Sequence, residues 1–301
     1  MTPQQVFHYK KKGRGSQGYR QRERTQERRQ LTCRCSFDYS LSIPPTGDKP
    51  EKKMIHIRTP QEIESMRQGN RLVAQVLRTL REAIKPGMTT KELDTMAEHA
   101  VRAAGANPAF KGYRGFPASL CVSINEEVVH GIPGPRVLKE GEIVSLDLGV
   151  YLNEYYGDAA ITVPVGTVGE EATRLLEVTQ QALLLGIEQA RDGNRLFDIS
   201  HAVQSWAESH GFSVVRDFVG HGIGRNLHED PQVPNFGPPH QGPRLRPGMV
   251  LAIEPMINAG TWEVTILEDK WTVVTADHRL SAHFEHTIAI TDGAADILTL
   301  P

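Results

Sequence analysis

Residues 143–165 read Ile-Val-Ser-Leu-Asp-Leu-Gly-Val-Tyr-Leu-Asn-Glu-Tyr-Tyr-Gly-Asp-Ala-Ala-Ile-Thr-Val-Pro-Val. Two runs rich in β-branched and aromatic residues flank Asn153-Glu154, a pattern that predicts a β-hairpin. We take the turn to be centred on Leu152 and Asn153. Asp147 and Asp158 then lie directly opposite each other on one face of the hairpin, with their Cβ atoms ~4.5–5.5 Å apart.

Two acidic residues so placed predict a cation site. Ionised carboxylates at this distance repel each other, and burial without a counter-ion forces one of them to take up a proton. The alternative is a pair of solvent-facing acids. Asp147 argues against that alternative, because it lies within a run that is typical of a buried strand. A buried acid needs a partner, and divalent cations supply one.

Three further segments strengthen this interpretation. His221 stands between two glycines after a predicted strand, where the backbone can approach a ligand closely. Glu254 lies in Val-Leu-Ala-Ile-Glu-Pro-Met, and Glu285 lies in His-Phe-Glu-His-Thr-Ile-Ala-Ile. Each acid costs several kcal/mol to bury unpaired. Shared cations account for all of these acids and the histidine together.

The predicted donor set contains four carboxylates and one imidazole, and it contains no thiolate. Such ligands suit Mn²⁺, Fe²⁺, Co²⁺ or Zn²⁺ better than copper or an iron–sulfur cluster. Bridging carboxylates hold two such ions ~3.5–4 Å apart and favour a bridging hydroxide. The site therefore predicts metal-dependent hydrolysis.

Around the hairpin, the sequence predicts two helices followed by strands, and this order occurs twice. Capping boxes at Thr59 and Thr89 begin the first two helices. A third helix is predicted over 170–190, and a fourth is predicted to begin near Asp198. Later strands are predicted over 213–219, 249–257, 271–275 and 282–290. The pattern predicts an α+β domain built from two related halves, each with helices packed on an antiparallel sheet.

Composition divides the chain into a basic N-terminal extension, 1–53, and a globular domain, 54–301. The extension carries 13 Lys or Arg and 5 Asp or Glu, whereas the rest carries 21 basic and 31 acidic residues. Its polar composition predicts disorder. Its charge fits either a polyanionic partner or a tail without a partner. Cys33-Arg-Cys35 lacks a second pair, which favours two free thiols over a zinc site.

The chain carries four longer motifs, which start at Ser123, Phe218, Ile253 and Ser281. They read Ser-Ile-Asn-Glu-Glu-Val-Val-His-Gly-Ile-Pro, Phe-Val-Gly-His-Gly-Ile-Gly-Arg-Asn-Leu-His-Glu-Asp-Pro-Gln-Val, Ile-Glu-Pro-Met and Ser-Ala-His-Phe-Glu-His-Thr. With these motifs, the chain from Met54 onward resembles the type I methionine aminopeptidases. The resemblance implies the pita-bread fold and removal of an N-terminal Met when the next residue is small.

The resemblance also implies a role for each candidate site residue. Asp147 is expected to chelate one of two metal ions, and His221 and Glu254 are expected to bind the other. Asp158 and Glu285 are expected to bridge the two ions. Glu254 also handles the proton of the attacking water. The resemblance adds two substrate-contacting histidines and a pocket for the Met side chain: His130, His228, Tyr113, Phe116, Cys121, Leu227 and Trp271.

Two positions depart from the family pattern. Ser145 stands where Asn is common, and Leu227 replaces an aromatic residue before His228. Neither change removes a predicted metal ligand. Without the resemblance, the pocket aromatics are better interpreted as ordinary core. Cys121 is expected to be a pocket wall and not a nucleophile, because no base is evident beside it.

Two other functions remain open at this point. One is an Xaa-Pro peptidase of the same fold, which shares the five metal ligands. The other is a non-catalytic binding protein on this scaffold. The expected partners are the N-terminal peptides of nascent proteins, and the basic extension is a hypothetical ribosome contact. We further expect a cytoplasmic location, because three cysteines make no disulfide framework and no apolar run is long enough to cross a bilayer. The resemblance also implies a monomer.

Overall fold

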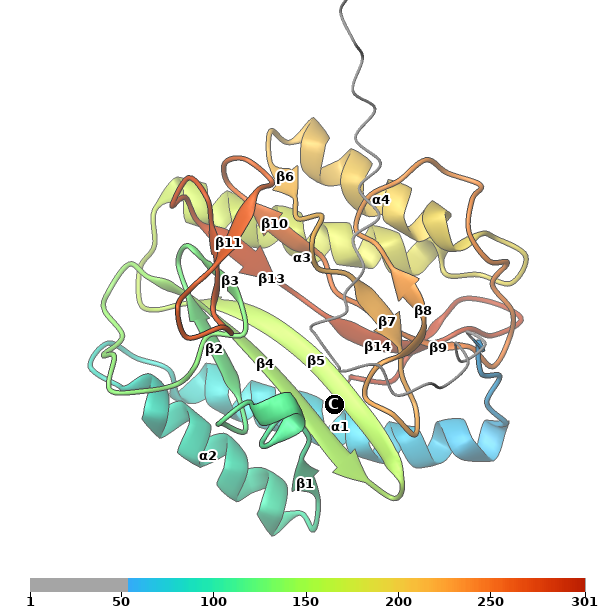
Figure 1. The fold of residues 1–301 in the computed structure, drawn as a ribbon, viewed down its shortest axis with the longest axis horizontal. Coiled ribbons are helices and arrows are strands. Elements are labelled where there is room, and N and C mark those ends of the chain that lie inside the picture. Colours follow the sequence, from blue (N-terminus) through green and yellow to red (C-terminus); the bar gives the residue numbers. More distant parts are fainter. Residues whose placement is uncertain (1–53, 301) are drawn as a thin grey trace, which may run out of the picture. The chain divides into compact units, whose positions relative to one another are not determined.

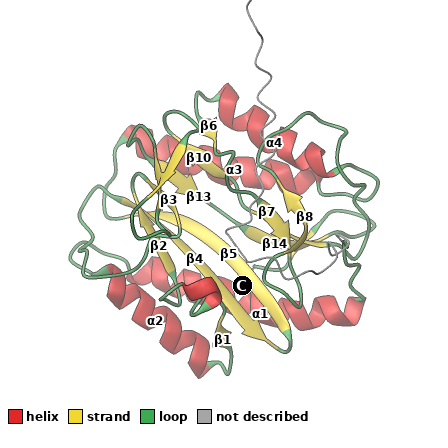
Figure 2. Cartoon of the chain, viewed as in Figure 1, coloured by secondary structure: helices red, strands yellow, loops and turns green. Residues whose placement is uncertain are grey.

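The computed structural model describes residues 54–300 of the chain. Helices flank antiparallel sheets, as predicted for an α+β domain (Figure 1, Figure 2). The α-helices of this part are α1 (Pro60–Ala83), α2 (Thr90–Ala103), α3 (Glu170–Gln189) and α4 (Leu196–Ser209). None of them is long and apolar enough to cross a membrane. The predictions for residues 1–53, which include the basic extension and Cys33-Arg-Cys35, lie outside the described residues.

Capping boxes begin the first two helices, as predicted. The Thr59 hydroxyl accepts the amide N–H of Glu62 at 3.3 Å, and the Glu62 carboxylate accepts the amide N–H of Thr59 at 2.9 Å. Thr89 and Glu92 repeat the arrangement at the start of α2. Helix α4 begins two residues earlier than predicted, because Asp198 accepts the Arg195 amide from inside the first turn.

The first half of the domain packs α1 and α2 on a sheet with the order β1-β4-β2, to which β5 adds by pairing with β4. The second half packs α3 and α4 against strands of two further sheets, with the orders β13-β10-β6 and β15-β14-β9-β7-β8. A small sheet, β11-β12-β3, contains strands from both halves of the sequence. The strands of the first sheet are β1 (Asn107–Pro108), β2 (Cys121–Ile124), β4 (Ile143–Leu152) and β5 (Tyr155–Pro164).

The remaining elements are short. They are η1 (Tyr113–Gly115), β3 (Glu127–Val129), β6 (Ser213–Val214), β7 (Gly220–Gly222), β8 (Glu229–Val233), β9 (Val250–Ile253), β10 (Met256–Asn258), β11 (Val264–Ile266), β12 (Val273–Thr275), β13 (Ser281–His283), β14 (His286–Ala289) and β15 (Asp296–Ile297). The strand predicted over 213–219 is therefore only two residues long, and His221 lies inside a strand of its own.

The hairpin of β4 and β5 is confirmed, but its predicted register is wrong. Its turn residues are Asn153 and Glu154, both with positive φ (53° and 68°), as in the two-residue loops that match strand twist. Leu152 therefore pairs with Tyr155, and the register sets Asp147 opposite Ala160. Asp147 and Asp158 share a face of the hairpin as diagonal neighbours, not as a directly opposed pair.

A directly opposed pair of acids occurs instead between Glu254 and Glu285. Two predicted strands each break in two, 249–257 into β9 and β10 and 282–290 into β13 and β14. Ile253 pairs with His286 and Met256 pairs with His283, so the same register on both sides of the break sets Glu254 opposite Glu285. Pro255 helps to explain the break, because it has no amide N–H to donate to a ladder.

Gly157 allows helix α1 to lie directly against β5. A Cβ atom at this position would come within 2.9 Å of the Asn70 backbone nitrogen. The close approach lets the Asn70 side chain accept the amide N–H of Asp158 at 3.3 Å. A side chain of helix α1 thus helps to position the backbone of Asp158.

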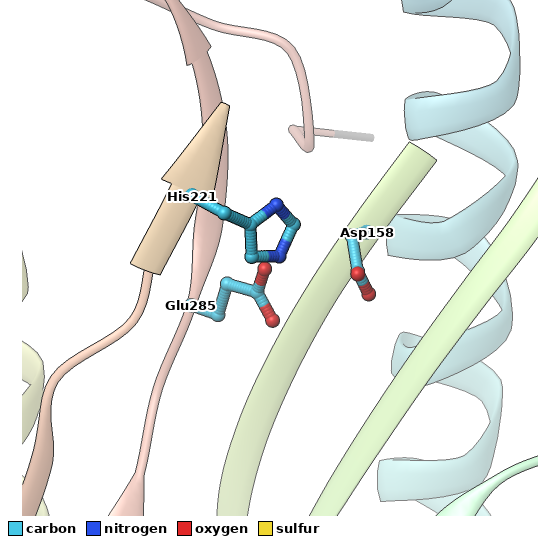
Figure 3. A group of neighbouring side chains, drawn as sticks. All are labelled: Asp158, His221 and Glu285. Carbon is cyan, nitrogen blue, oxygen red and sulfur yellow. The ribbon is translucent and has the colours of Figure 1, made fainter. Parts of the chain in front are cut away.

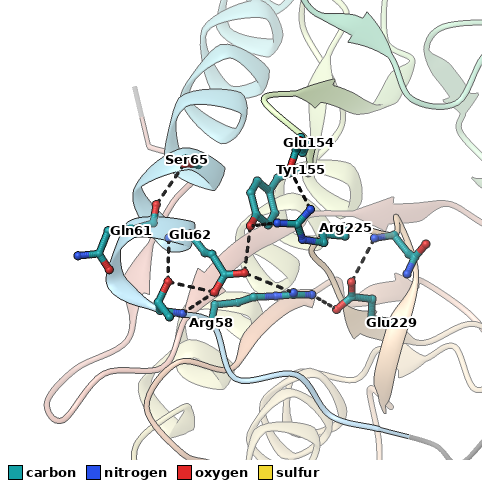
Figure 4. Close-up of polar contacts among 10 residues, drawn as sticks. Arg58, Gln61, Glu62, Ser65, Glu154, Tyr155, Arg225 and Glu229 are labelled. Carbon is teal, nitrogen blue, oxygen red and sulfur yellow. Dashed lines mark hydrogen bonds and ion pairs between the residues drawn. The ribbon is translucent and has the colours of Figure 1, made fainter.

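A buried ion pair joins the segment before α1 to the segment that carries His228 (Figure 4). Arg58 donates to Glu229, and the two side chains are only 7% and 5% exposed. Glu229 also accepts the amide N–H of Asn226 at 3.1 Å. The Arg58 backbone N–H donates to Gly248 at 2.7 Å, which anchors the other end of the contact.

We predict that Glu229→Gln destabilises the domain by about 3–5 kcal/mol, because it removes the close counter-charge of the buried Arg58 guanidinium and leaves only Glu62, at 4.0 Å. Chemical denaturation measures the change. The matched control is Glu171→Gln, which breaks the exposed pair with Arg279 and is expected to change stability by less than about 1 kcal/mol. Equal effects in the two variants would contradict the importance of the buried pair.

Candidate metal centre

One cavity gathers residues from both halves of the domain. All of the predicted metal ligands and all of the predicted substrate-pocket residues line it. They are Asp147, Asp158, His221, Glu254, Glu285, Tyr113, Phe116, Cys121, His130, Leu227, His228 and Trp271. Acids and histidines that are far apart in the sequence therefore share one cavity with apolar side chains.

Separate elements bring the predicted metal ligands together. Asp158, His221 and Glu285 each offer a ligand atom, and these atoms all lie within 4.8 Å of one another (Figure 3). They extend from β5, from β7 and from the break between β13 and β14. His221 Nε2 also lies 3.5 Å from a carboxylate oxygen of Glu254. Asp147 comes from β4 and lines the same cavity.

The residues fit a cation site, because several buried ligand atoms lack a hydrogen-bond partner. Among the described residues, one oxygen each of Asp147, Asp158 and Glu285 is buried without a partner. Buried polar atoms are almost always satisfied in folded proteins. Unpaired carboxylate oxygens that face one another are the donors that a divalent cation binds.

The electrostatics of the cluster lead to the same conclusion. Burial raises the pKa of Asp147 to about 7. Burial, together with the neighbouring carboxylates, raises the pKa values of Asp158, Glu254 and Glu285 well above their ordinary range. Burial lowers the pKa of His221 to about 4, so its imidazole is neutral at pH 7 and can bind a metal.

His228 and His130 occupy the cavity beside this cluster. The Tyr113 hydroxyl lies 2.9 Å from His228 Nδ1, and the two rings stack at 5.4 Å. Burial is the first cause that lowers the pKa of His228, to about 3, and burial lowers the pKa of His130 to about 4. Both imidazoles are therefore neutral at pH 7. If Tyr113 donates to Nδ1, the hydrogen of His228 is on Nε2, where it can be donated to a carbonyl oxygen.

The apolar side of the cavity is formed by aromatic rings around Cys121. Phe116 packs edge-on against Trp271 at 5.1 Å, and the His130 ring lies 6.3 Å from Trp271. Burial, and then the charge of Asp147, raise the pKa of the Cys121 thiol well above its ordinary value. A thiol that keeps its proton is a poor nucleophile, which supports the interpretation of Cys121 as a pocket wall.

The two departures from the family pattern have simple structural accounts. The Ser145 hydroxyl lies 2.8 Å from the Thr162 hydroxyl on the paired strand. Thr162 in turn donates to the backbone carbonyl of His283 at 2.7 Å. Leu227 is buried and lines the cavity. Ser145 thus links β4 and β5 to the strand that precedes Glu285.

Sequence reasoning missed part of the lining. The missed residues are Phe110, Arg114, Val129, Phe218, Val219, Met256 and His283. Five of these residues lie within the four motifs, close in sequence to predicted ligands, and this position could have indicated that they line the cavity. They are Val129, Phe218, Val219, Met256 and His283. His283 is the most polar of these, and its buried Nε2 lies 3.9 Å from a Glu254 oxygen. Phe110 and Arg114 lie outside the four motifs.

The chain is similar to known metallopeptidases. Residues 64–292 match metallopeptidase family M24. The chain is 57% identical over 246 residues to methionine aminopeptidase 1 of Bacillus subtilis, covering 82% of this chain and 99% of that protein. It is 54% identical over 247 residues to a methionine aminopeptidase of Clostridium perfringens, covering 82% of this chain and 99% of the relative.

Solved structures confirm the pita-bread fold. The methionine aminopeptidase of Thermotoga maritima has a TM-score of 0.81 at 50% identity, covering 82% of this chain and 100% of that one. The prolidase of Pyrococcus horikoshii has a TM-score of 0.67 at 22% identity, covering 81% of this chain and 63% of that one, and it supports the fold alone. The chain belongs to metallopeptidase family M24 and, within it, to the type I methionine aminopeptidases.

Proposed function

We propose that this enzyme hydrolyses the first peptide bond of proteins that begin with Met, when the second residue is small. The observation that carries the proposal is the single cavity in which a carboxylate and histidine cluster adjoins an apolar compartment. The carboxylates and histidines can hold the metal ions that hydrolysis of a peptide bond needs. The apolar compartment can accept the unbranched thioether side chain of Met. The named activity of relatives at 57% and 54% identity supports the same substrate.

We assign the five clustered residues to two divalent ions. Asp147 would hold one ion, His221 and Glu254 would hold the other, and Asp158 and Glu285 would bridge them. Bound ions supply Lewis acidity and a hydroxide at neutral pH. The donor atoms are those expected for Mn²⁺, Fe²⁺, Co²⁺ or Zn²⁺.

The side chains of the cavity supply the remaining chemistry. A neutral His228 donates from Nε2 to the scissile carbonyl oxygen and stabilises the charge that develops there. Glu254 accepts a proton from the attacking water, and Glu254 or His130, which lines the same cavity, returns a proton to the leaving amide nitrogen. Phe116, Cys121 and Trp271 enclose the Met side chain and exclude water from it.

Location and assembly complete the proposal. We expect a cytoplasmic monomer that acts on nascent chains, with the basic extension as the ribosome contact. The charge of residues 1–53 is the basis for that contact, because Lys and Arg clusters bind phosphate backbones. A ribosome co-sedimentation assay at low salt, with and without residues 1–53, tests it.

The Xaa-Pro peptidase alternative is not favoured. Prolidases share the fold at 22% identity, whereas methionine aminopeptidases reach 57%. We predict cleavage of Met-Ala-Ser with release of free Met, and little hydrolysis of an Xaa-Pro dipeptide. Mass spectrometry of the products measures both reactions. A clear preference for the Xaa-Pro substrate would overturn the choice of substrate.

The metal assignment predicts that Asp147→Asn and His221→Ala each lower kcat/KM by more than about 100-fold, beyond the losses typical of residues that only support a ligand. The fold should persist, which circular dichroism checks. Asp192→Asn is the matched control, because Asp192 is exposed and does not line the cavity. Near-normal turnover in either ligand variant would refute the assignment.

The raised carboxylate pKa values predict that metal binding releases protons. Protons that burial keeps on the acids at pH 6.5 must leave before a cation binds. Affinity should therefore rise with pH, and proton release should be larger at pH 6.5 than at pH 8.5. Titration calorimetry with Mn²⁺ in buffers of different ionisation enthalpy measures this release. Binding without any proton release at pH 6.5 would contradict the prediction.

A further inference from the structure

Arg114 stands at the opening of the cavity and is not needed for any step described above. It is exposed, yet it lines the same space as the acids and histidines. It is the only Lys or Arg among the cavity-lining residues of the described part of the chain. Its guanidinium carbon lies 5.3 Å from the centre of the Tyr113 ring.

The backbone holds Arg114 in an unusual conformation. Its φ and ψ are 49° and 23°, in the left-handed region, inside η1. A residue other than Gly costs roughly 1–2 kcal/mol there. The turn that contains Arg114 also carries Tyr113, whose hydroxyl contacts His228. The fold thus holds the backbone of Arg114 next to Tyr113, whose hydroxyl contacts the proposed catalytic histidine.

Arg114 has no carboxylate partner among residues 54–300. Arg225, which is also exposed, pairs with Glu154 at 2.9 Å, and Lys111 pairs with Glu98 at 2.7 Å. No ion pair within 4.0 Å includes Arg114 in this part of the chain. Within the described residues, the Arg114 guanidinium is therefore available to pair with a carboxylate of a bound peptide.

A bound peptide has to leave the cavity through its exposed end. The first side chain occupies the apolar compartment, and the scissile bond lies at His228 under the proposed function. The residues after the scissile bond then extend toward solvent, where Arg114 lies. We propose that Arg114 selects peptides with a carboxylate at the third residue. This inference rests on the proposed aminopeptidase function.

The background charge of the molecule makes this inference easy to test. Residues 54–301 carry 21 basic and 31 acidic residues, so the overall field favours cationic peptides. A local effect of Arg114 favours anionic ones. The sign of the preference therefore distinguishes the two causes.

The experiment compares kcat/KM for Met-Ala-Glu-Ala-amide, Met-Ala-Gln-Ala-amide and Met-Ala-Lys-Ala-amide with the metal-loaded enzyme. We expect the Glu peptide to exceed the Lys peptide by about threefold, as for an exposed ion pair. The ratio should approach one in about 1 M salt, where the Debye length is only ~3 Å. Met-Ala-Ser as the free acid and as the amide separates a terminal carboxylate from a side-chain carboxylate.

The Glu to Lys ratio is then measured in variants. Arg114→Gln should abolish the preference, Arg114→Glu should reverse it, and Arg114→Lys should keep most of it. Arg71→Gln is the control, because Arg71 is an exposed residue of α1 outside the cavity and the charge change is the same.

Two results would overturn the inference. One is a ratio near or below one in the unaltered enzyme at low salt, and the other is a ratio that Arg114→Gln leaves unchanged. Cleavage of the Gln peptide in the same experiment keeps the proposed function intact in either case. Failure to cleave any of the peptides would instead count against the function itself.

Discussion

Repulsion among buried carboxylates is the constraint on which the rest of this structure depends. Asp147, Asp158, Glu254 and Glu285 line one cavity, where burial and mutual charge raise their pKa values. Asp147 and Asp158 lie on paired strands of one sheet, whereas Glu254 and Glu285 lie at breaks between strands of two other sheets, and apolar packing holds these elements in place. The fold therefore brings together acids that, in the absence of a counter-charge, take up protons. The donor set, the neutral histidines and the family membership are all consistent with cations in that role.

The main features of the fold could be predicted from local chemistry. Thr59 and Thr89 begin helices because each forms a reciprocal hydrogen-bond box with a glutamate three residues later. The hairpin was evident from two apolar runs around Asn153-Glu154. Its register was not evident from the sequence. Both turn residues, Asn153 and Glu154, adopt a positive φ, so the partner of Asp147 is Ala160, two positions beyond the predicted Asp158. The breaks at Glu254 and Glu285 were hidden inside continuous apolar runs.

The acids of the candidate metal cluster could be predicted for a physical reason, whereas the candidate substrate-binding residues could not. Acids inside apolar strands indicate a missing partner, so Asp147, Glu254 and Glu285 could be identified individually. His130 and His228 came only from the family resemblance, since neither carries a burial anomaly in the sequence. Arg114 lies in the short helix η1 and Phe110 lies just before it, in a segment whose path depends on tertiary contacts. No local pattern predicts where such a segment closes over a cavity.

The position of the acids in the two halves has a mechanical consequence. Asp147 and Asp158 belong to the first half, whereas His221, Glu254 and Glu285 belong to the second. Ions held by all five residues would act as a non-covalent cross-link between segments that are about 140 positions apart in the sequence. The two halves also contact each other through apolar side chains. Ile161, for example, packs against the apolar cluster of the first half and against that of the second half. Occupancy of the catalytic centre would thereby determine how far the two halves unfold as one cooperative unit.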